Sequence, residues 1–315
     1  MLVVKRYTPD KSAEWDAFVA LSRNGTFLFM RNYMDYHSER FSDHSLMFYN
    51  KSRLCALLPG NVVGATYYSH QGLTYGGLIV GMKMMTHNMV ELFESLNEYL
   101  QSIGINKVIY KAIPWIYHSY PTEEDLYALH FICKAQIVAR HISSAIYLPL
   151  RPPLTESRKS GLRKALSGNL RIEECTPSKL CDFWEILSTN LENKYKASPV
   201  HSLEEISLLC KRFPSNIKLY GAFDGSKMLG GTLLYLTPHV VHTQYISASA
   251  EGKSRGALDL LFDTLLQKDW SGTQYFEFGK SSEGDGSSLN GALLFQKEGF
   301  GGRGVVYDWY EWNVE

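Results

Sequence analysis

The order of expected helices and strands runs through this chain twice, and the second series follows the first by about 170 residues. A hairpin, a strand, a helix, a strand, a helix and a last strand are expected in residues 45–150 and again in 217–314. Solenoid repeats are shorter and more numerous than this. The sequence therefore predicts two copies of one mixed α/β domain.

Local signals support several of these elements. Residues 89–105 carry apolar side chains at the three- and four-residue spacing of a helix face, and Gly104 is placed to end that helix. Asp224-Gly225 is a strong hairpin turn signal in the second series. In the first series the corresponding turn is expected at Asn50-Lys51-Ser52.

Two further segments carry expectations that depend on single residues. Residues 66–80 are predicted to be one aromatic-rich strand, interrupted by Gly76-Gly77. Residues 122–136 are predicted to be a helix with Thr122 as its N-cap and Asp125 at the capping-box position.

The two copies are expected to meet near Arg151. The stretch that follows opens with a Pro-Pro linker and continues into a basic helix. We therefore expect an N-terminal domain over 1–150 and a C-terminal domain over 151–315, with a groove between them. By the repeat, Lys111 and Lys280 each follow a short buried strand at equivalent places.

Charge and cysteine usage exclude several classes of protein. Lys plus Arg and Asp plus Glu each number 32 among 315 residues, so the formal net charge is zero, and a DNA-coating protein should be basic. The five cysteines are scattered without a CxxC pair, which predicts neither a zinc site nor a disulfide framework. No signal peptide or transmembrane run is visible, so we expect a cytoplasmic protein without a bound metal.

The order of elements in each half is that of the GNAT acyltransferase fold, and two such domains in tandem resemble the FemABX-like branch of that superfamily. The segment 157–165 resembles the basic helix that opens the second domain in this branch. Further along, the chain is similar to a family pattern at Glu277, Phe278, Gly279, Lys280, Ser281, Phe295, Lys297 and Gly299. Residues 68–77 and 109–129 resemble bacterial FemAB-like proteins of surface-polysaccharide or lipid-linked sugar pathways.

The resemblance implies an acyl- or aminoacyl-transferase that moves an acyl group onto an amine of a cell-envelope or sugar-linked acceptor. The donor is open between acyl-CoA and aminoacyl-tRNA. The helical hairpin that some members insert for tRNA is absent here, which disfavours tRNA. The acyl-CoA phosphate loop is degraded to Gly252, Lys253, Ser254, Arg255 and Gly256. Backbone N–H groups at a helix start still attract phosphate, so this segment is the candidate cofactor site.

Three residues are candidates for catalysis. Lys280 can neutralise a phosphate or a developing oxyanion as a mobile point charge. Glu277 can take the proton that an attacking ammonium must lose. Tyr245, in the strand before the phosphate-type loop, can protonate a leaving group. His239 and His242 have no carboxylate or cysteine nearby in sequence, so we expect surface or satisfied strand positions for them.

A larger set of polar residues is predicted to bind the substrate. In the first half these are His70, Gln71, Tyr75, Lys111, Tyr117 and His118, and in the second half Arg158, Lys159, Arg163, Ser281 and Lys297. The alternatives are a bulged strand with a Gly-Gly turn for His70, Gln71 and Tyr75, and a solvated cationic helix face for the basic residues. An alternative function is a non-catalytic module that holds a sugar or peptide.

Overall fold

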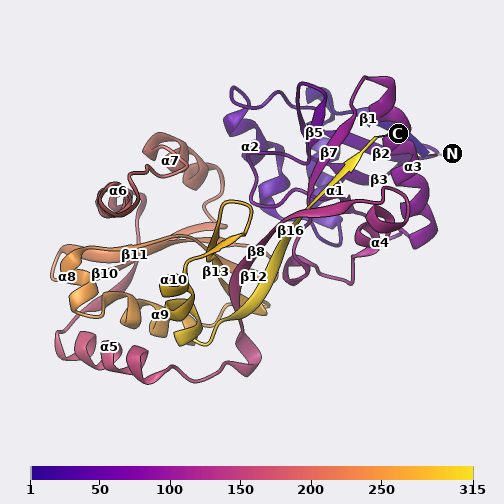
Figure 1. Cartoon of the computed structure of the whole chain (residues 1–315). Helices are drawn as coiled ribbons and strands as arrows, with labels where there is room; N and C mark the ends of the chain where they lie inside the picture. The colour runs from indigo at the N-terminus through magenta and orange to yellow at the C-terminus, as the bar shows by residue number, and fades with distance from the viewer. Residues whose placement is uncertain (1, 315) are drawn as a thin grey trace. The chain divides into compact units, whose positions relative to one another are not determined.

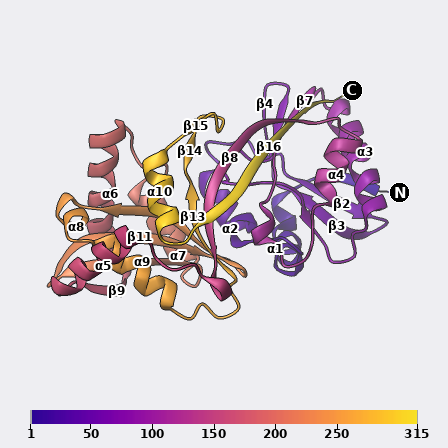
Figure 2. The same ribbon diagram turned by 60° about the horizontal axis from the view of Figure 1, so that its bottom comes forward.

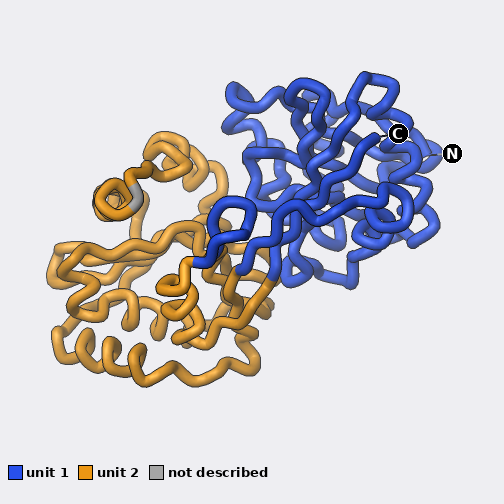
Figure 3. The backbone as a smooth tube through the Cα atoms, in the orientation of Figure 1, with its two compact units in different colours: residues 1–142, 282–289, 306–315 blue, residues 143–281, 290–305 orange. Residues whose placement is uncertain are grey.

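The computed structural model describes residues 2–314, with Tyr195 described by its backbone alone, and Figure 1 shows its helices and strands. Packing divides the chain into two compact units. Unit 1 takes residues 1–142, 282–289 and 306–315, and unit 2 takes 143–281 and 290–305 (Figure 3). This division follows packing, whereas the expected domains 1–150 and 151–315 follow chain order. The last strand of the chain therefore belongs mostly to unit 1.

Unit 1 is built from two larger sheets, one short two-stranded sheet and the helices beside them. Its elements are β1 (Leu2–Arg6), α1 (Ser12–Leu21), α2 (Arg31–Met34), β2 (Leu46–Asn50), β3 (Arg53–Leu58), β4 (Asn61–Val63), β5 (Thr66–Tyr68), β6 (Ile79–Val80), α3 (Thr86–Ser102), β7 (Lys107–Lys111), α4 (Glu124–Phe131), β14 (Ser282–Glu283) and β15 (Ser288–Leu289). One sheet has the antiparallel order β1-β2-β3-β6. In the other, β7 pairs in parallel with β5 and antiparallel with β16 (Arg303–Asn313).

Unit 2 is one sheet with helices on both faces, as Figures 1 and 2 show. Its elements are α5 (Glu156–Ser167), β9 (Arg171–Cys175), α6 (Leu180–Tyr195), α7 (Leu203–Arg212), β10 (Ile217–Asp224), β11 (Lys227–Leu236), β12 (Val240–Ala248), α8 (Ala250–Ser254), α9 (Ala257–Gln267), β13 (Tyr275–Lys280) and α10 (Gly291–Gly299). Its strand order is β8-β13-β12-β11-β10-β9, where β8 is Gln136–Tyr147. Helices α6 and α7 cover one face, and α9 with α5 behind it covers the other.

The predicted repeat is present in the strand pairing. In unit 2, β13 pairs in parallel with β12 and antiparallel with β8. In unit 1, β7 has the same two kinds of neighbour, the parallel β5 and the antiparallel β16. The last strand of each series completes the sheet of the other unit, because β8 follows the first series and β16 the second.

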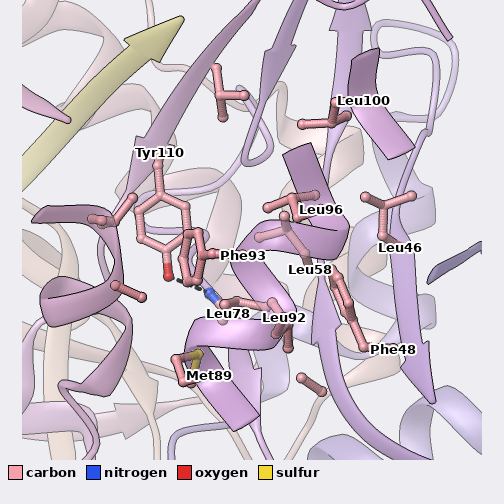
Figure 4. Packing of buried hydrophobic residues seen from close by; sticks show 14 of the residues in the cluster. Leu46, Phe48, Leu58, Leu78, Met89, Leu92, Phe93, Leu96, Leu100 and Tyr110 are labelled. Carbon is pink, nitrogen blue, oxygen red and sulfur yellow. Dashed lines mark hydrogen bonds between the residues drawn. The ribbon is translucent and has the colours of Figure 1, made fainter. Parts of the chain in front are cut away.

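The apolar face predicted for the helix at 89–105 forms the core of unit 1. Figure 4 shows Leu92, Phe93 and Leu96 of α3 packed towards Leu46 and Phe48 of the neighbouring sheet. All five of these side chains are fully buried. In unit 2 the core is aromatic, with Phe262, Phe276, Phe278 and Phe300 in mutual ring contact.

Two local expectations were wrong. Residues 66–80 do not form one strand, because β5 ends at Tyr68 and β6 begins only at Ile79. Thr122 is not a helix cap: its hydroxyl donates to the Tyr120 carbonyl, and α4 begins at Glu124 without a side-chain cap. The polar stretch after Ser281 forms a short hairpin of β14 and β15.

Candidate functional site

The parallel strands β12 and β13 separate after a short ladder. Only Val240–His242 and Tyr275–Glu277 pair with each other, although β12 runs on to Ala248 and β13 to Lys280. A bulge in β12 at this level shifts its register with β11 between Leu233 and Leu234. The separated ends open the sheet from within, at the carboxyl ends of both strands.

A pocket of about 190 Å³, called the unit 2 pocket below, lies beside these separated ends. Its lining is Leu187, Asn190, Leu191, Lys194, Ile246, Ser247, Ala248, Lys253, Leu258, Phe262, Phe278, Leu293, Gln296, Lys297 and Phe300. The walls are mostly apolar and the polar groups few, which is the composition of a small-molecule site. Helices α6, α9 and α10 supply most of the wall that the two strands leave open.

Lys297 is the buried charged group of this pocket, with 3% of its surface exposed. Its ammonium donates to the carbonyls of Gly279 and Lys280, at 2.7 Å each. Burial lowers its pKa to about 8, and the carboxylate of Glu277 opposes that fall. An ammonium has three N–H donors. The third has no acceptor among the residues that the structure describes, so it can be offered to a ligand.

Glu277 lies behind the pocket and is fully buried. One carboxylate oxygen accepts from the Ser143 hydroxyl and, at 3.0 Å, from the Gly279 amide, and the other shares a hydrogen bond with Nδ1 of His242. Burial alone would raise the pKa of this carboxyl, but His242, Ser143 and Lys297 outweigh burial and hold the pKa below its usual value. Glu277 is therefore a buried anion that fixes its neighbours.

Lys280 is the last residue of β13 and lies opposite Ser143 in the register with β8. Burial lowers its pKa to about 8 and Glu277 opposes the shift, as for Lys297. Ser281 follows with 2% of its surface exposed, and its hydroxyl makes no hydrogen bond to any described residue.

Tyr245 is partnered on the face covered by α6 and does not line the unit 2 pocket. Its hydroxyl lies 2.6 Å from Nδ1 of His201, and its ring meets Trp184 edge to face. Burial raises the pKa of the Tyr245 hydroxyl. These contacts hold the Tyr245 side chain in place, and its role as an acid stays a prediction.

Several donors of the segment 252–256 are already used inside unit 2. The amide of Gly252 donates to the Ser249 hydroxyl and that of Lys253 to the Ser249 carbonyl. The side chain of Lys253 donates to Asn190, and the hydroxyl of Ser254 donates to the carbonyl of Glu251.

The charge of Arg255 is also used inside unit 2, by Asp224 and Glu251. Gly256 has a φ of +74°, and a Cβ there would meet the carbonyl oxygen of Gly161 at 2.2 Å. The glycine is thus explained by the close packing of α5 on α9. The expectation that backbone N–H groups of this segment are available for phosphate was wrong for Gly252 and Lys253.

The basic helix α5 divides its charges between two faces. Arg158 faces α9, where it pairs with Asp259 at 2.8 Å and lies over the Phe300 ring. Lys159 pairs with Glu156 on its own helix, and Arg163 is exposed. The three predicted ligands of an anion therefore do not point to one place.

In unit 1 the structure brings three of the predicted substrate residues, His70, Gln71 and Lys111, together at one turn. The ammonium of Lys111 donates to the carbonyls of His70, Gln71 and Leu73 at 2.9–3.2 Å, and it lies over the Trp309 ring. The backbone of His70 has a φ of +60°, and burial lowers the pKa of its ring to about 3. These contacts hold the turn between β5 and β6.

The other predicted residues of unit 1 are also well packed. Tyr75 and Tyr117 are buried with ring centroids 4.6 Å apart, and their hydroxyls contact Thr26 and Tyr307 respectively. His118 contacts the carbonyl of Ile113, and burial lowers its pKa to about 4. This cluster is well suited to hold the fold, and a role in binding stays a prediction.

Sequence reasoning missed the partner of His242. It is a satisfied strand position, as expected, but its partner is Glu277, 35 residues along the chain. Register in the parallel pair places the two opposite each other, and the strand pairing could have revealed this. The pocket residues of α6, such as Asn190 and Lys194, gave no signal in the sequence, because nothing there shows which face of a helix lies over a strand end.

Within residues 2–314, no group of three or more His, Cys, Asp and Glu side chains is placed to hold a metal ion. No helix in the same range has both the length and the apolar character needed to cross a bilayer.

Comparison with known proteins gave matches among solved structures alone. No family model and no curated protein matches the chain. The crystal structure of FemX superposes with a TM-score of 0.68 at 11% identity, covering 99% of this chain and 97% of that one. The lysylphosphatidylglycerol synthetase L-PGS from Bacillus licheniformis gives 0.62 at 11%, covering 99% and 93%.

A tandem GNAT protein from the clavulanic acid biosynthesis pathway superposes with a TM-score of 0.52 at 12% identity, covering 100% of this chain and 99% of that one. The chain has the FemABX-like tandem GNAT fold. Each unit of this fold has the same order of strands around one parallel pair, β12 with β13 in unit 2 and β5 with β7 in unit 1.

Proposed function

We propose that the unit 2 pocket is the centre of an N-acyl- or aminoacyl-transferase whose acceptor is an amine of a cell-envelope or sugar-linked molecule. The observation that carries the proposal is the buried Lys297 ammonium, which presents an N–H donor at the open ends of β12 and β13. The FemABX-like fold supports it, because FemX and L-PGS share this fold along nearly the whole chain. A cytoplasmic location and a lipid-linked acceptor are parts of the same proposal.

The reaction forms one bond and breaks another at the donor carbonyl carbon. The acceptor nitrogen attacks, the carbonyl oxygen becomes an oxyanion, and the C–O or C–S bond to the leaving group then breaks. The nitrogen loses a proton and the leaving oxygen or sulfur takes one up. The third N–H of Lys297 hydrogen-bonds to the oxyanion, and a donor of this kind contributes about 10²–10³ in rate.

Glu277 and His242 act on this centre as positioning residues. Glu277 touches no pocket surface, but its charge keeps the buried ammonium of Lys297 protonated to a higher pH than burial alone would allow. Lys280 shares that carboxylate and supplies a second positive charge at the end of β13. Binding of the donor and the acceptor side by side orients them for reaction, and this orientation supplies the rest of the rate enhancement.

The residues present do not fit the diphosphate of coenzyme A at the predicted segment. The amides of Gly252 and Lys253 and the side chain of Arg255 are already used within unit 2. The activated donor is an acyl ester or thioester, with aminoacyl-tRNA and acyl-CoA as the two classes to be compared.

A non-catalytic sugar- or peptide-binding module is the second candidate. The saturated contacts of Lys111 favour it for unit 1, since all three of its N–H donors already meet carbonyl groups. In a duplicated chain, one copy of the domain can bind a ligand without reacting while the other copy carries out the reaction.

The experiment measures donor binding and transfer with the full chain. Thermal shift against acyl-CoAs and aminoacyl-tRNAs should find one donor class that stabilises the protein, by about 2.7 kcal/mol at 100 times its Kd. Mass spectrometry then follows transfer to amino sugars and lysine-containing peptides. Leu191→Trp should fill the unit 2 pocket and abolish both signals.

The matched control is Leu208→Trp, which adds the same ring on α7 at a partly exposed position away from the pocket. If Leu191→Trp and Leu208→Trp bind and transfer alike, the unit 2 pocket is not the centre. Binding of a sugar or peptide without any transfer would favour the binding module.

A further inference from the structure

Unit 1 contains a pocket of its own, with a volume of about 450 Å³ against about 190 Å³ for the unit 2 pocket. It lies between α1, the turn that joins β2 to β3, the segment after β6 and the start of α3. Its apolar walls are Ala17, Phe18, Leu21, Leu54, Met82 and Met84. None of the residues predicted to carry chemistry lines it.

The mouth of this unit 1 pocket is apolar and exposed. Leu21 and Met82 line the pocket while 77% and 54% of their surfaces are exposed. Met85, beside the pocket residue Met84, is 60% exposed. Large apolar side chains gathered at a hollow mark a binding surface more often than isolated ones do.

Arg23 holds this rim in place. Its backbone amide donates to the carbonyl of Val80, and its guanidinium donates to the carbonyl of Met84 and to Glu124. A weaker bond at 3.4 Å reaches the carbonyl of Pro121. Tyr120, which precedes that proline, is 58% exposed. With Arg23 itself buried, the rim is a fixed feature of unit 1.

Two cations stand at this pocket. Arg53 and Lys83 both line it and are exposed, and neither forms an ion pair with any residue between 2 and 314. The one acid in the lining, Glu14, is already bound to Lys11 and to the hydroxyl of Tyr49. The site therefore combines an apolar hollow with uncompensated positive charge.

We infer that the unit 1 pocket receives an acyl chain of an anionic phospholipid at a membrane surface, with Arg53 and Lys83 beside the lipid phosphate. The chain fills the apolar hollow, and Leu21, Met82, Met85 and Tyr120 enter the interface between head groups and acyl chains. Basic residues near an anionic leaflet each strengthen binding, while a neutral leaflet offers them no such partner. This binding does not depend on the transfer reaction proposed for unit 2.

The test is co-sedimentation of the full chain with vesicles. Vesicles of phosphatidylcholine with roughly 30 mol % phosphatidylglycerol have an anionic surface and should bind the protein. Vesicles of pure phosphatidylcholine should bind it much less. Arg53→Gln with Lys83→Gln should reduce binding by about 10- to 30-fold, from about 1 kcal/mol for each basic residue. Lys164→Gln with Lys211→Gln removes the same charge from exposed positions of unit 2 and should change binding little.

A second pair of variants separates the pocket from the rim. Ala17→Trp places a ring in the hollow, and Ala20→Trp places the same ring on the same helix outside the lining. Both positions are exposed, so both variants should fold with the wild-type melting temperature. Loss of vesicle binding in Ala17→Trp alone supports the inference. Equal binding of the two variants, equal binding to both kinds of vesicle, or no vesicle binding would overturn it.

Discussion

His242 and Glu277 lie opposite each other on the parallel strands β12 and β13, and Nδ1 of the imidazole shares a hydrogen bond with the carboxylate. Because the pKa of Glu277 is held below its usual value, the carboxylate is ionised and can only accept. Nδ1 therefore carries the proton in this bond. His242 and Glu277 are the last paired residues of β12 and β13. Through its charge, Glu277 also interacts with Lys280 and Lys297, beyond the point where the two strands separate.

Removal of the Glu277 charge should weaken both the fold and the site. Glu277→Ala leaves the buried Lys297 and the partly buried Lys280 without their carboxylate, and loss of one partner from a buried charged cluster costs about 3–5 kcal/mol. Urea unfolding measures the loss. Glu277→Gln keeps the volume and should lower the pKa of Lys297 further below about 8, because the carboxylate is the group that raises it. A Glu277→Ala protein as stable as wild type would contradict this role.

Gly256 should tolerate no side chain. Gly256→Ala combines a φ of +74° with a contact at 2.2 Å to the carbonyl oxygen of Gly161, so α5 must move away from α9. Strain of this kind costs about 1–3 kcal/mol before the clash is counted. Gly225→Ala is the control, because its φ of +56° carries the backbone strain while its Cβ meets nothing within 4 Å. Equal unfolding free energies for the two variants would show that helix packing is not the reason for Gly256.

Arg158 and Arg163 should differ in their effect on stability. Arg158→Gln removes the partner of Asp259, whose side chain is 12% exposed, and an unsatisfied buried group costs about 1–3 kcal/mol. Arg163 is exposed, so Arg163→Gln should leave the free energy of unfolding within about 0.5 kcal/mol of wild type. Chemical denaturation of the two variants compares them directly. A larger loss of unfolding free energy for Arg163→Gln than for Arg158→Gln would contradict the role of the Arg158–Asp259 pair and would favour a solvated position for Arg158.

The sequence was sufficient for the order of elements because periodicity is a local property. The apolar spacing of 89–105 and the Asp224-Gly225 turn each appear where they were expected. The sequence could not predict that β8 and β16 each complete the sheet of the other unit. Nothing in the residues of β8 or β16 says which copy of the repeat each will pair with.

Part of the candidate site could also be predicted from the sequence. The family pattern singled out Lys280, Glu277 and Lys297, and the structure brings these three close to one another. It could not show that Lys297 alone lines the unit 2 pocket, because that depends on how far α10 reaches over the end of β13. Nor could spacing show that Lys253 and Arg255 are already paired.

The central claim is that the protonated Lys297 stabilises the oxyanion, and the pH dependence of single-turnover transfer tests it most directly. The rate should rise as the acceptor amine loses its proton and fall as the pH passes about 8, where the buried ammonium loses its charge. Lys297→Met should lower the rate by about 10²–10³ and remove the fall above that pH. Lys211→Met serves as the exposed control and should follow the wild-type profile. A Lys297→Met protein with the wild-type rate and the same descending limb would contradict the account.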